Sequence, residues 1–276
     1  MDENLNHYLS RWKLSDPQLL AQTPTSHVYT VTRAGDTLVL KLLTEYGWEE
    51  QRGAAALRHY DGHGAVRLYA ADEHAQLLEY ASGDDLISLV ERGDDTGATR
   101  IIAEVLNQLH GVAQGKPADG VFPLKDWFRS LFARAASEDN SIFARAVPVA
   151  ERLLNAPRDV RVLHGDVHHG NIRQSARGWL AFDPKGLVGE RTYDCANTLC
   201  NPFRGQPGYD PLVHNEQRLL TNAGILADTL GIEFRRVLAF TYAYACLSAS
   251  WSLDARAESH ARWALNIAQI IEPHLD

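Results

Sequence analysis

Residues 164–171 read HGDVHHGN, and the side chains of this segment could support two kinds of chemistry. Its three histidines suggest a metal site, whereas Asp166, followed five residues later by Asn171, suggests proton transfer beside a bound cation. Twelve residues further on, the apolar run WLAF ends in a second aspartate, Asp183. Placing a carboxylate at the end of a buried strand costs several kcal/mol unless the group is paired or binds a cation. Both aspartates are therefore candidates for a functional role.

The three residues together match the requirements of phosphoryl transfer. In that reaction one aspartate accepts the proton of a hydroxyl, and an asparagine and a second aspartate hold Mg²⁺ against the phosphates. Kinase catalytic loops place the asparagine five residues after the aspartate, as this chain does. Alone, Asp166 would more simply be a turn residue or a helix cap. With Asn171 and Asp183 present, we interpret Asp166 as a catalytic base and the other two as metal ligands.

A zinc site formed by His164, His168 and His169 is the competing interpretation. Adjacent side chains such as His168 and His169 point apart in extended backbone, and zinc needs ligands that converge. No cysteine or third segment supplies a further ligand in the sequence. We therefore expect His164 to brace the loop by hydrogen bonding, and His168 and His169 to be loop residues near a substrate.

The segment TLVLKLL places Lys41 inside an apolar strand. A lysine in that position is either an edge-strand charge or a phosphate ligand. The helix predicted over residues 48–60 begins with Glu49 and Glu50, and kinases pair a strand lysine with a helix glutamate. We favour Glu50, because it precedes the alanine-rich face, although Glu49 remains open. Unpaired surface charges are the alternative.

Two further segments are candidates for nucleotide binding. AQLLEYA ends a predicted strand in a bend, where the backbone of Glu79, Tyr80 and Ala81 could bind an adenine edge. The turn QTPTSHVY lacks a GxGxxG motif, so phosphate binding there would depend on the backbone and hydroxyl groups of Thr25 and Ser26. The missing glycines argue against a protein kinase.

The elements that must position these residues change character along the chain. The first 80 residues show strand patterns and one helix, in the order three strands, helix, two strands. From residue 84 onward helical periodicity prevails, and a short β insert carries HGDVHHGN. Strands first and helices later indicate an α+β chain of two lobes, joined near residues 80–84. The individual helices are predicted over residues 99–110, 124–136 and 142–154, with three more after residue 211.

Composition restricts the class of protein. The chain has 276 residues, 45% of them hydrophobic and 22% charged, which is ordinary for a globular protein. The net charge of −8 argues against a nucleic-acid partner and suits a cationic small molecule, or serves only solubility. No signal-peptide pattern and no run of ~18 apolar residues is present, so we expect a cytoplasmic protein without a membrane partner. The three cysteines lack CxxC spacing and are interpreted as small buried hydrophobes.

Several segments together resemble the aminoglycoside phosphotransferases, and within them the aminoglycoside/hydroxyurea resistance kinases. The specific combination is HGDVHHGN with FDPKGLVGE, and the weaker segments are GAVRLY, LLEYA and AYACLSASW. The resemblance covers nearly the whole chain. It implies a protein-kinase-like, two-lobed α+β fold, with a β-rich nucleotide-binding N-lobe at residues 1–82 and a mainly helical C-lobe at residues 83–276. It also implies transfer of a phosphoryl group from ATP, with Mg²⁺, to a hydroxyl group.

The resemblance assigns roles to the same residues. It makes Asp166 the base, Asn171 and Asp183 the metal ligands, and Lys41, with Glu50 behind it, the contact to the α- and β-phosphates. The acceptor implied first is streptomycin, phosphorylated on its 6-hydroxyl; alternatives are another amino sugar, hydroxyurea, or nucleotide binding without turnover. Candidate contacts to a cationic acceptor are Glu190, His168, Asp126, Asp210 and Asp254.

Overall fold

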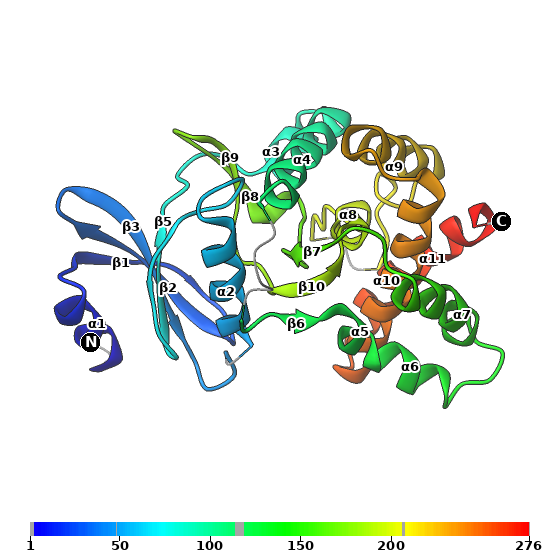
Figure 1. Cartoon of the computed structure of the whole chain (residues 1–276), viewed down its shortest axis with the longest axis horizontal. Coiled ribbons are helices and arrows are strands. Elements are labelled where there is room, and N and C mark those ends of the chain that lie inside the picture. The colour runs from blue at the N-terminus through cyan, green and yellow to red at the C-terminus, as the bar shows by residue number, and fades with distance from the viewer. Residues whose placement is uncertain (1–2, 48, 114–118, 206–207, 276) are drawn as a thin grey trace.

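The computed structural model describes residues 3–47, 49–113, 119–205 and 208–275, so Trp48 of the predicted helix lies outside the described residues. The chain begins with a β-rich part and continues as a mainly helical part (Figure 1). The predicted order of three strands, a helix and two strands is confirmed, and so is the α+β class. We keep the division between residues 82 and 83 as a proposal; it lies between a strand that ends at Glu79 and a helix that begins at Leu86.

Five antiparallel strands form the first sheet, in the order β1-β2-β3-β5-β4. Lys41 lies on β3, the middle strand of this sheet, so it is not an edge-strand charge. The elements of this part are α1 (Glu3–Arg11), β1 (Ser15–Gln22), β2 (Ser26–Arg33), β3 (Asp36–Leu43), α2 (Glu50–Tyr60), β4 (Leu68–Ala71) and β5 (Ala75–Glu79).

The two faces of the sheet are covered differently, because side chains alternate along β3. Leu40 is buried on one face, in a cluster with Leu5 and Tyr8 of α1. Val39 and Lys41 line a cavity on the other face. Helix α1 was not predicted from the sequence, because its segment ENLNHYLSR is mostly polar and buries few side chains. Its apolar contacts appear only when it lies against the sheet.

The second part of the chain consists mainly of helices, and the three helices predicted after residue 211 are confirmed. The helix predicted over residues 124–136 is divided at Phe128 into two short helices. The helices are α3 (Leu86–Glu91), α4 (Asp95–His110), α5 (Leu124–Trp127), α6 (Arg129–Ala135), α7 (Ile142–Asn155), α8 (Asp194–Leu199), α9 (Glu216–Leu230), α10 (Phe234–Asp254) and α11 (Glu258–Ile271).

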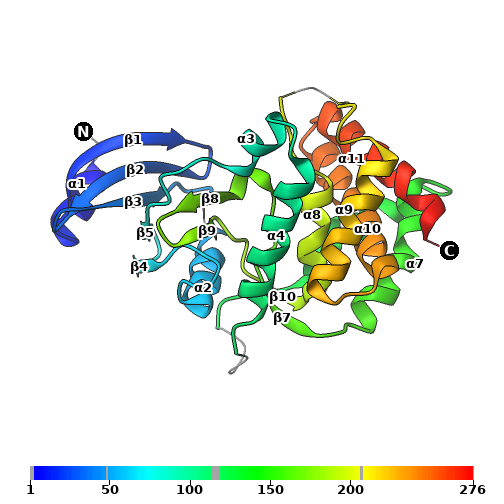
Figure 2. The same cartoon turned by 90° about the horizontal axis from the view of Figure 1, so that it is seen from above.

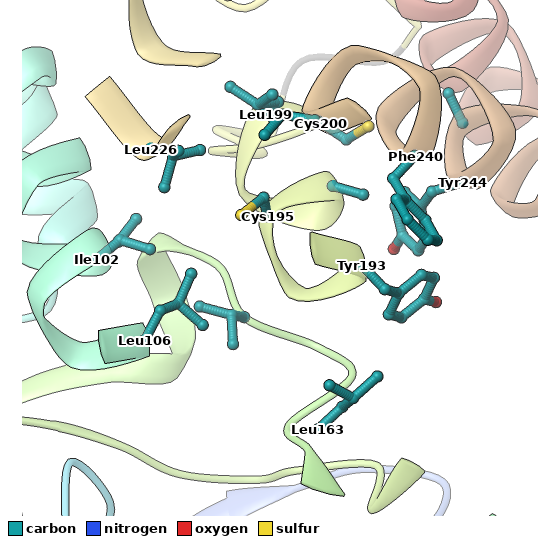
Figure 3. Packing of buried hydrophobic residues seen from close by; sticks show 14 of the residues in the cluster. Ile102, Leu106, Leu163, Tyr193, Cys195, Leu199, Cys200, Leu226, Phe240 and Tyr244 are labelled. Atoms are coloured by element: carbon teal, nitrogen blue, oxygen red, sulfur yellow. The ribbon is translucent and has the colours of Figure 1, made fainter. Parts of the chain in front are cut away.

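Helix α8 lies at the centre of the helical part, and all of its residues are buried. Figure 3 shows side chains of α8 among those of α4, α9 and α10. The rings of Tyr193, which precedes α8, and Tyr244 of α10 pack edge to face with centroids 5.8 Å apart. Cys195, Cys200 and Cys246 are buried free thiols in this core, which confirms their interpretation as small hydrophobes. The loops before and after α8 are therefore anchored to a well-packed core.

Short strands carry the polar motifs between the two parts. Strands β8 (Ile172–Ser175) and β9 (Gly178–Ala181) form a hairpin, and β7 (Val160–Leu163) pairs with β10 (Leu187–Glu190), which also pairs with β6 (Phe122–Pro123). Figure 2 shows the hairpin between the sheet and α4. No helix in the described ranges is long and apolar enough to cross a membrane.

Candidate active site

A cavity of about 460 Å³ lies between the five-stranded sheet and the β8–β9 hairpin, with residues from both in its lining. Part of the lining is apolar and comes from Val28, Val39, Val66, Leu78 and Phe182. A cavity with an apolar part of this kind suits a nucleotide base. The residues that the sequence predicted for nucleotide binding all line this cavity: Thr25, Ser26, Lys41, Glu50, Glu79, Tyr80 and Ala81.

The ammonium group of Lys41 lies between two carboxylates. Its Nζ atom donates to Glu50 Oε2 at 2.7 Å and also to Asp183 Oδ1. Burial lowers the pKa of Lys41, but the charges of Asp183 and Glu50 outweigh burial and raise it. Glu49, the alternative partner, is half exposed and lies 3.7 Å from Arg52. The structure therefore decides for Glu50, as the sequence analysis favoured, and holds a charged lysine in the cavity.

Helix α2 brings Glu50 to this position because its backbone touches the loop after Asp183. A Cβ atom on Gly53 would lie 2.4 Å from the Pro184 carbonyl oxygen. Conversely, a Cβ atom on Gly186 would lie 2.1 Å from the Arg52 carbonyl oxygen, and Gly186 has a φ of +65°. Only glycine permits so close an approach of two backbones. The two glycines thus fix the distance between Glu50 and Asp183.

At the end of β5 the chain offers free backbone groups to the cavity. Among the backbone hydrogen bonds of the described residues, none involves Tyr80 or Ala81. The Glu79 carboxylate is not available, since it accepts from Arg177 Nη2 at 2.5 Å and from the Arg67 N–H at 3.0 Å. The free backbone groups of Tyr80 and Ala81 therefore agree with the prediction that this bend binds an adenine edge.

The turn between β1 and β2 is tied to the ion pair beside it. The Thr25 hydroxyl donates to Glu50 Oε1 at 3.1 Å. The Ser26 N–H donates to Thr23 Oγ1 at 3.0 Å, so this N–H is already used within the turn. Thr25 and Ser26 both face the cavity, and their contact with phosphate stays a prediction.

Asp166 lies at the start of the loop after β7, with its two carboxylate oxygens in different surroundings. Asp166 Oδ1 accepts a hydrogen bond of 2.7 Å from the side-chain amide of Asn197. Asp166 Oδ2 has only longer contacts, at 3.4 Å each, to Asn171 Nδ2 and Lys185 Nζ. The carboxylate is therefore oriented through one oxygen, while the other is left to accept a proton.

A buried carboxylate holds the backbone of this loop. Asp194, at the start of α8, accepts hydrogen bonds from the N–H of His164 at 3.1 Å and from the N–H of Gly165 at 2.7 Å. His164 in turn donates from Nε2 to the Phe182 carbonyl at 3.0 Å, and its Nδ1 accepts from the Asp166 N–H. Burial lowers the pKa of His164, so it is neutral. The prediction that His164 braces the loop is confirmed.

Asn171 and Asp183 are brought together by the β8–β9 hairpin. Ile172 pairs with Ala181, and the Phe182 N–H donates to the Asn171 carbonyl at 3.0 Å, which places the next residue, Asp183, beside Asn171. Asp183 has a φ of +63°, a conformation that costs a non-glycine residue about 1–3 kcal/mol. Such strain is typical of residues held for function.

These two side chains fit a small divalent cation. Asn171 uses its amide nitrogen to donate to the Asp166 carbonyl, at 3.0 Å, which leaves its amide oxygen for a cation. Burial alone would raise the pKa of Asp183, but the charges of Lys41 and Lys185 lower it to about 2. One permanently ionised carboxylate and one amide oxygen are the hard ligands that Mg²⁺ prefers. His164 has no ring nitrogen free for zinc, because Nε2 is hydrogen bonded to the Phe182 carbonyl and Nδ1 to the Asp166 N–H, so the three histidines do not combine as zinc ligands.

Comparison with known proteins agrees with this geometry. The family model described as aminoglycoside/hydroxyurea antibiotic resistance kinase matches residues 11–255. The chain belongs to this family of kinases. It is therefore a phosphotransferase that acts on a hydroxyl group, as the resemblance implied.

Individual relatives refine this picture of the resistance kinase. A streptomycin 3''-kinase of Klebsiella pneumoniae is 40% identical over 245 residues, covering 88% of this chain and 90% of the relative. A streptomycin 6-kinase of Streptomyces glaucescens is 27% identical over 274 residues, with coverage of 96% and 87%. An aminoglycoside phosphotransferase solved with AMP-PNP and hygromycin B has a TM-score of 0.69 at 14% identity, with 98% of each chain covered, and shows the protein-kinase-like fold.

Three of the acidic residues predicted to bind the acceptor of this resistance kinase have other partners. Glu190 is buried and binds Arg236, with the Nε–Oε1 and Nη2–Oε2 distances both 2.5 Å. It lies at the end of β10, which pairs with the start of β7, whereas Asp166 follows the end of β7. Asp210 is fully buried, and both of its oxygens accept from Arg204. Asp254 is exposed but accepts from Arg134 and Ser130. The structure therefore gives no support to these three residues as acceptor contacts, because each carboxylate already has an arginine partner.

The other two predicted acceptor contacts of the kinase, Asp126 and His168, have no ion-pair partner among the described residues. Asp126 is exposed on α5. His168 lies in the loop between Asp166 and Asn171, where its Nδ1 accepts from the Gly170 N–H at 3.1 Å and burial lowers its pKa. His168 is therefore neutral and offers a hydrogen-bonding group, not a charge.

Two residues from later segments, Asn197 and Lys185, contact Asp166 and were not predicted from the sequence. Asn197 lies on α8, 31 residues after Asp166, and carries no recognisable motif. Asp194 supports Asp166 indirectly, because it accepts from the backbone N–H groups of His164 and Gly165 just before it. Lys185 was visible only as part of DPKG, with no indication of where its side chain would point.

Proposed function

We propose that this resistance kinase transfers the γ-phosphoryl group of ATP to a hydroxyl group of streptomycin. The observation that carries the proposal is that a single cavity is lined by the Lys41–Glu50 ion pair, Asp183 and Lys185. Lys185 in turn contacts Asp166 at 3.4 Å. Streptomycin is chosen because two relatives that cover most of the chain bear its name. ATP is chosen because a neighbour with the same fold was solved with AMP-PNP.

The residues of the chain divide the work as follows. Backbone groups of Tyr80 and Ala81 bind the adenine edge, and Lys41, held by Glu50, binds the phosphates. The acceptor hydroxyl gives its proton to Asp166 Oδ2 while its oxygen bonds to the γ-phosphorus. The bond from that phosphorus to the oxygen of ADP breaks, and ADP leaves. A positioned base of this kind contributes ~10²–10⁴ in rate.

Asn171 and Asp183 would hold Mg²⁺, which when bound neutralises charge on the phosphates. The fit rests on the free amide oxygen of Asn171 and on the permanently ionised carboxylate of Asp183. The strained backbone of Asp183 keeps that carboxylate aimed at the cavity.

We propose the 3''-hydroxyl of streptomycin as the acceptor group, in place of the 6-hydroxyl expected from the sequence. The support is the higher identity to the 3''-kinase, 40% against 27% for a 6-kinase. A hydroxyurea phosphotransferase of Kitasatospora aureofaciens, 30% identical over 261 residues, makes hydroxyurea the second candidate acceptor. Asp126 and His168 are the acceptor contacts that we keep.

The test is a phosphorylation assay with purified protein, ATP and Mg²⁺. The acceptors are streptomycin, hygromycin B, hydroxyurea and a simple amino sugar, and product is read by ADP release and a gain of one phosphate in mass. Two-dimensional NMR of the product then locates the phosphate at position 3'' or 6. We expect phosphate at position 3'' of streptomycin. If hydroxyurea alone gains phosphate, phosphoryl transfer to a hydroxyl group stands, but streptomycin as the acceptor is wrong.

A further inference from the structure

The ammonium group of Lys185 lies between the two aspartates of the site and is not used by the roles given above. Its Nζ atom is 3.4 Å from Asp166 Oδ2, and its side chain lines the same cavity as Asp183 and Lys41. Asp183, Asp166 and Glu50 all act on it electrostatically. A lysine side chain is a cation at neutral pH, and the Asp166 carboxylate 3.4 Å away favours that charge.

Lys185 differs from Lys41 in how fully its charge is satisfied. Lys41 is 9% exposed and contacts Glu50 at 2.7 Å as well as Asp183. The Lys185 side chain is 35% exposed, and its contact of 3.4 Å with Asp166 is too long for a strong charge-assisted hydrogen bond. Lys185 therefore keeps N–H donors for a group that enters the cavity, whereas Lys41 already uses two of its three donors on Glu50 and Asp183.

The backbone around Lys185 is held rigidly against the catalytic loop. The Lys185 N–H donates to the His164 carbonyl at 2.7 Å. Pro184 before it and Gly186 after it are in close backbone contact with α2. The base of the side chain is thus fixed relative to both Asp166 and Glu50, which is the preorganisation that electrostatic catalysis requires.

We propose that Lys185 is a catalytic residue whose ammonium group binds the transferring phosphoryl group, between the base and the metal ligand. The inference rests on the proposed function, because it takes the γ-phosphoryl group to lie between Asp166 and Asp183. In the transition state the acceptor oxygen is forming its bond to phosphorus and the bond to ADP is breaking, so negative charge spreads over the phosphoryl oxygens. Lys185 stabilises that charge through hydrogen bonds and neither gains nor loses a proton.

The first test compares Lys185→Met with wild type. Removing one preorganised donor to a developing charge typically lowers turnover ~10²–10³-fold. We expect kcat to fall by that factor while the KM for the acceptor and the affinity for ADP change less than about twofold, because these ligands lack the transferring group. A variant that keeps kcat within about threefold of wild type, or that loses ADP affinity as strongly as kcat, would overturn the proposal.

The second test does not need the acceptor to be known. ADP with aluminium fluoride and Mg²⁺ imitates the transferring phosphoryl group, and its binding is measured by calorimetry. Lys185→Met should weaken this complex ~10²-fold or more and leave ADP alone unaffected. If wild type phosphorylates none of the acceptors, the proposed function fails. The aluminium fluoride complex still reports on Lys185 separately, and equal binding by wild type and variant would sink the role of Lys185.

A chemical rescue separates lost charge from misfolding. Lys185→Cys can be alkylated with 2-bromoethylamine, which restores an ammonium group at nearly the length of lysine. The reaction is selective because all three native cysteines are buried. Recovery of at least tenfold in kcat is expected, and no recovery in a folded, fully alkylated protein would contradict the proposal. Lys13→Met, at an exposed lysine beyond α1, is the matched control and should behave as wild type.

Discussion

Gly53 on α2 and Pro184 in the loop after β9 are in direct backbone contact, so close that a Cβ atom on Gly53 would lie 2.4 Å from the Pro184 carbonyl oxygen. This contact is what sets the distance between the helix that carries Glu50 and the loop that carries Asp183 and Lys185. The Lys41–Glu50–Asp183 arrangement therefore depends on a residue that has no functional group of its own.

Gly53→Ala should weaken MgATP binding. Because the methyl group must push α2 from the loop, we expect an overpacking cost of about 1–3 kcal/mol. If ~1.4 kcal/mol of this cost disturbs the Lys41–Glu50 ion pair, the affinity for MgATP falls tenfold. Calorimetry measures that affinity. Gly224→Ala, in α9 with nothing within 4 Å of its Cβ position, is the control and should bind MgATP normally. Equal affinities of both variants would show that the contact has no part in binding.

Asp166→Asn should abolish most turnover and leave the affinity for MgATP nearly unchanged. Since an amide cannot accept the hydroxyl proton, kcat should fall by ~10²–10⁴. The affinity for MgATP should stay within about twofold, because Asp166 is not a phosphate or metal contact in this scheme. The exposed Asp228→Asn on α9 serves as the control in the same coupled assay. Wild-type turnover in Asp166→Asn would show that Asp166 is not the catalytic base.

Asn197→Ala should lower kcat through the orientation of Asp166. A hydrogen bond to a charged group contributes ~1.5–3 kcal/mol, which corresponds to about 10–100-fold in rate if it acts on the transition state. The KM values for ATP and acceptor should change little, because Asn197 contacts neither ligand in the proposed scheme. Steady-state kinetics with both substrates varied provides the measurement. A rise in KM at constant kcat would instead place Asn197 in acceptor binding.

Glu190→Gln should affect stability and leave acceptor binding intact. The substitution leaves Arg236 without its buried partner, and breaking such a pair costs ~3–5 kcal/mol. The free energy of unfolding in urea measures this loss, and the KM for streptomycin at a temperature where the protein is folded should be unchanged. The exposed Glu233→Gln, whose partner Arg158 is also exposed, should cost at most ~1 kcal/mol. A raised KM with normal stability would restore Glu190 as a substrate contact.

The stabilising effect of Asp183 should depend on pH in a defined window. In the folded protein its pKa is lowered to about 2 from the ordinary 3.8, so the folded state binds the proton less readily than the unfolded state. The stabilisation is therefore complete above about pH 4 and is lost as pH falls toward 2. The difference in Tm between wild type and Asp183→Asn should shrink across this window. A difference that stays constant from pH 5 to 2 would contradict the shift.

The sequence by itself determined the order of the elements and the identity of the central site residues. Alternating apolar residues predict β3 and its neighbours, and the spacing of Asp166, Asn171 and Asp183 at strand ends predicts a phosphoryl-transfer site. These signals are local, since they depend on residues a few positions apart or on the ends of neighbouring short strands. The order of the strands and helices was confirmed, whereas the roles of the site residues stay predictions. Helix α1 was not predicted although Leu5, Tyr8, Leu9 and Trp12 have helical spacing and pack against the sheet; the segment is short and mostly polar, which weakens that pattern.

Only the tertiary structure decided which charged residues are free to act. Glu190 looked as available as Asp126 in the sequence, but Arg236, 46 positions later, neutralises it. Lys185 and Asn197 looked unremarkable, yet both contact Asp166 across 19 and 31 positions. The physical reason is that the ability of a charged side chain to bind a ligand depends on its burial and on the nearest opposite charge. Both are set by the packing of α2, α8 and the β8–β9 hairpin, which no local pattern encodes.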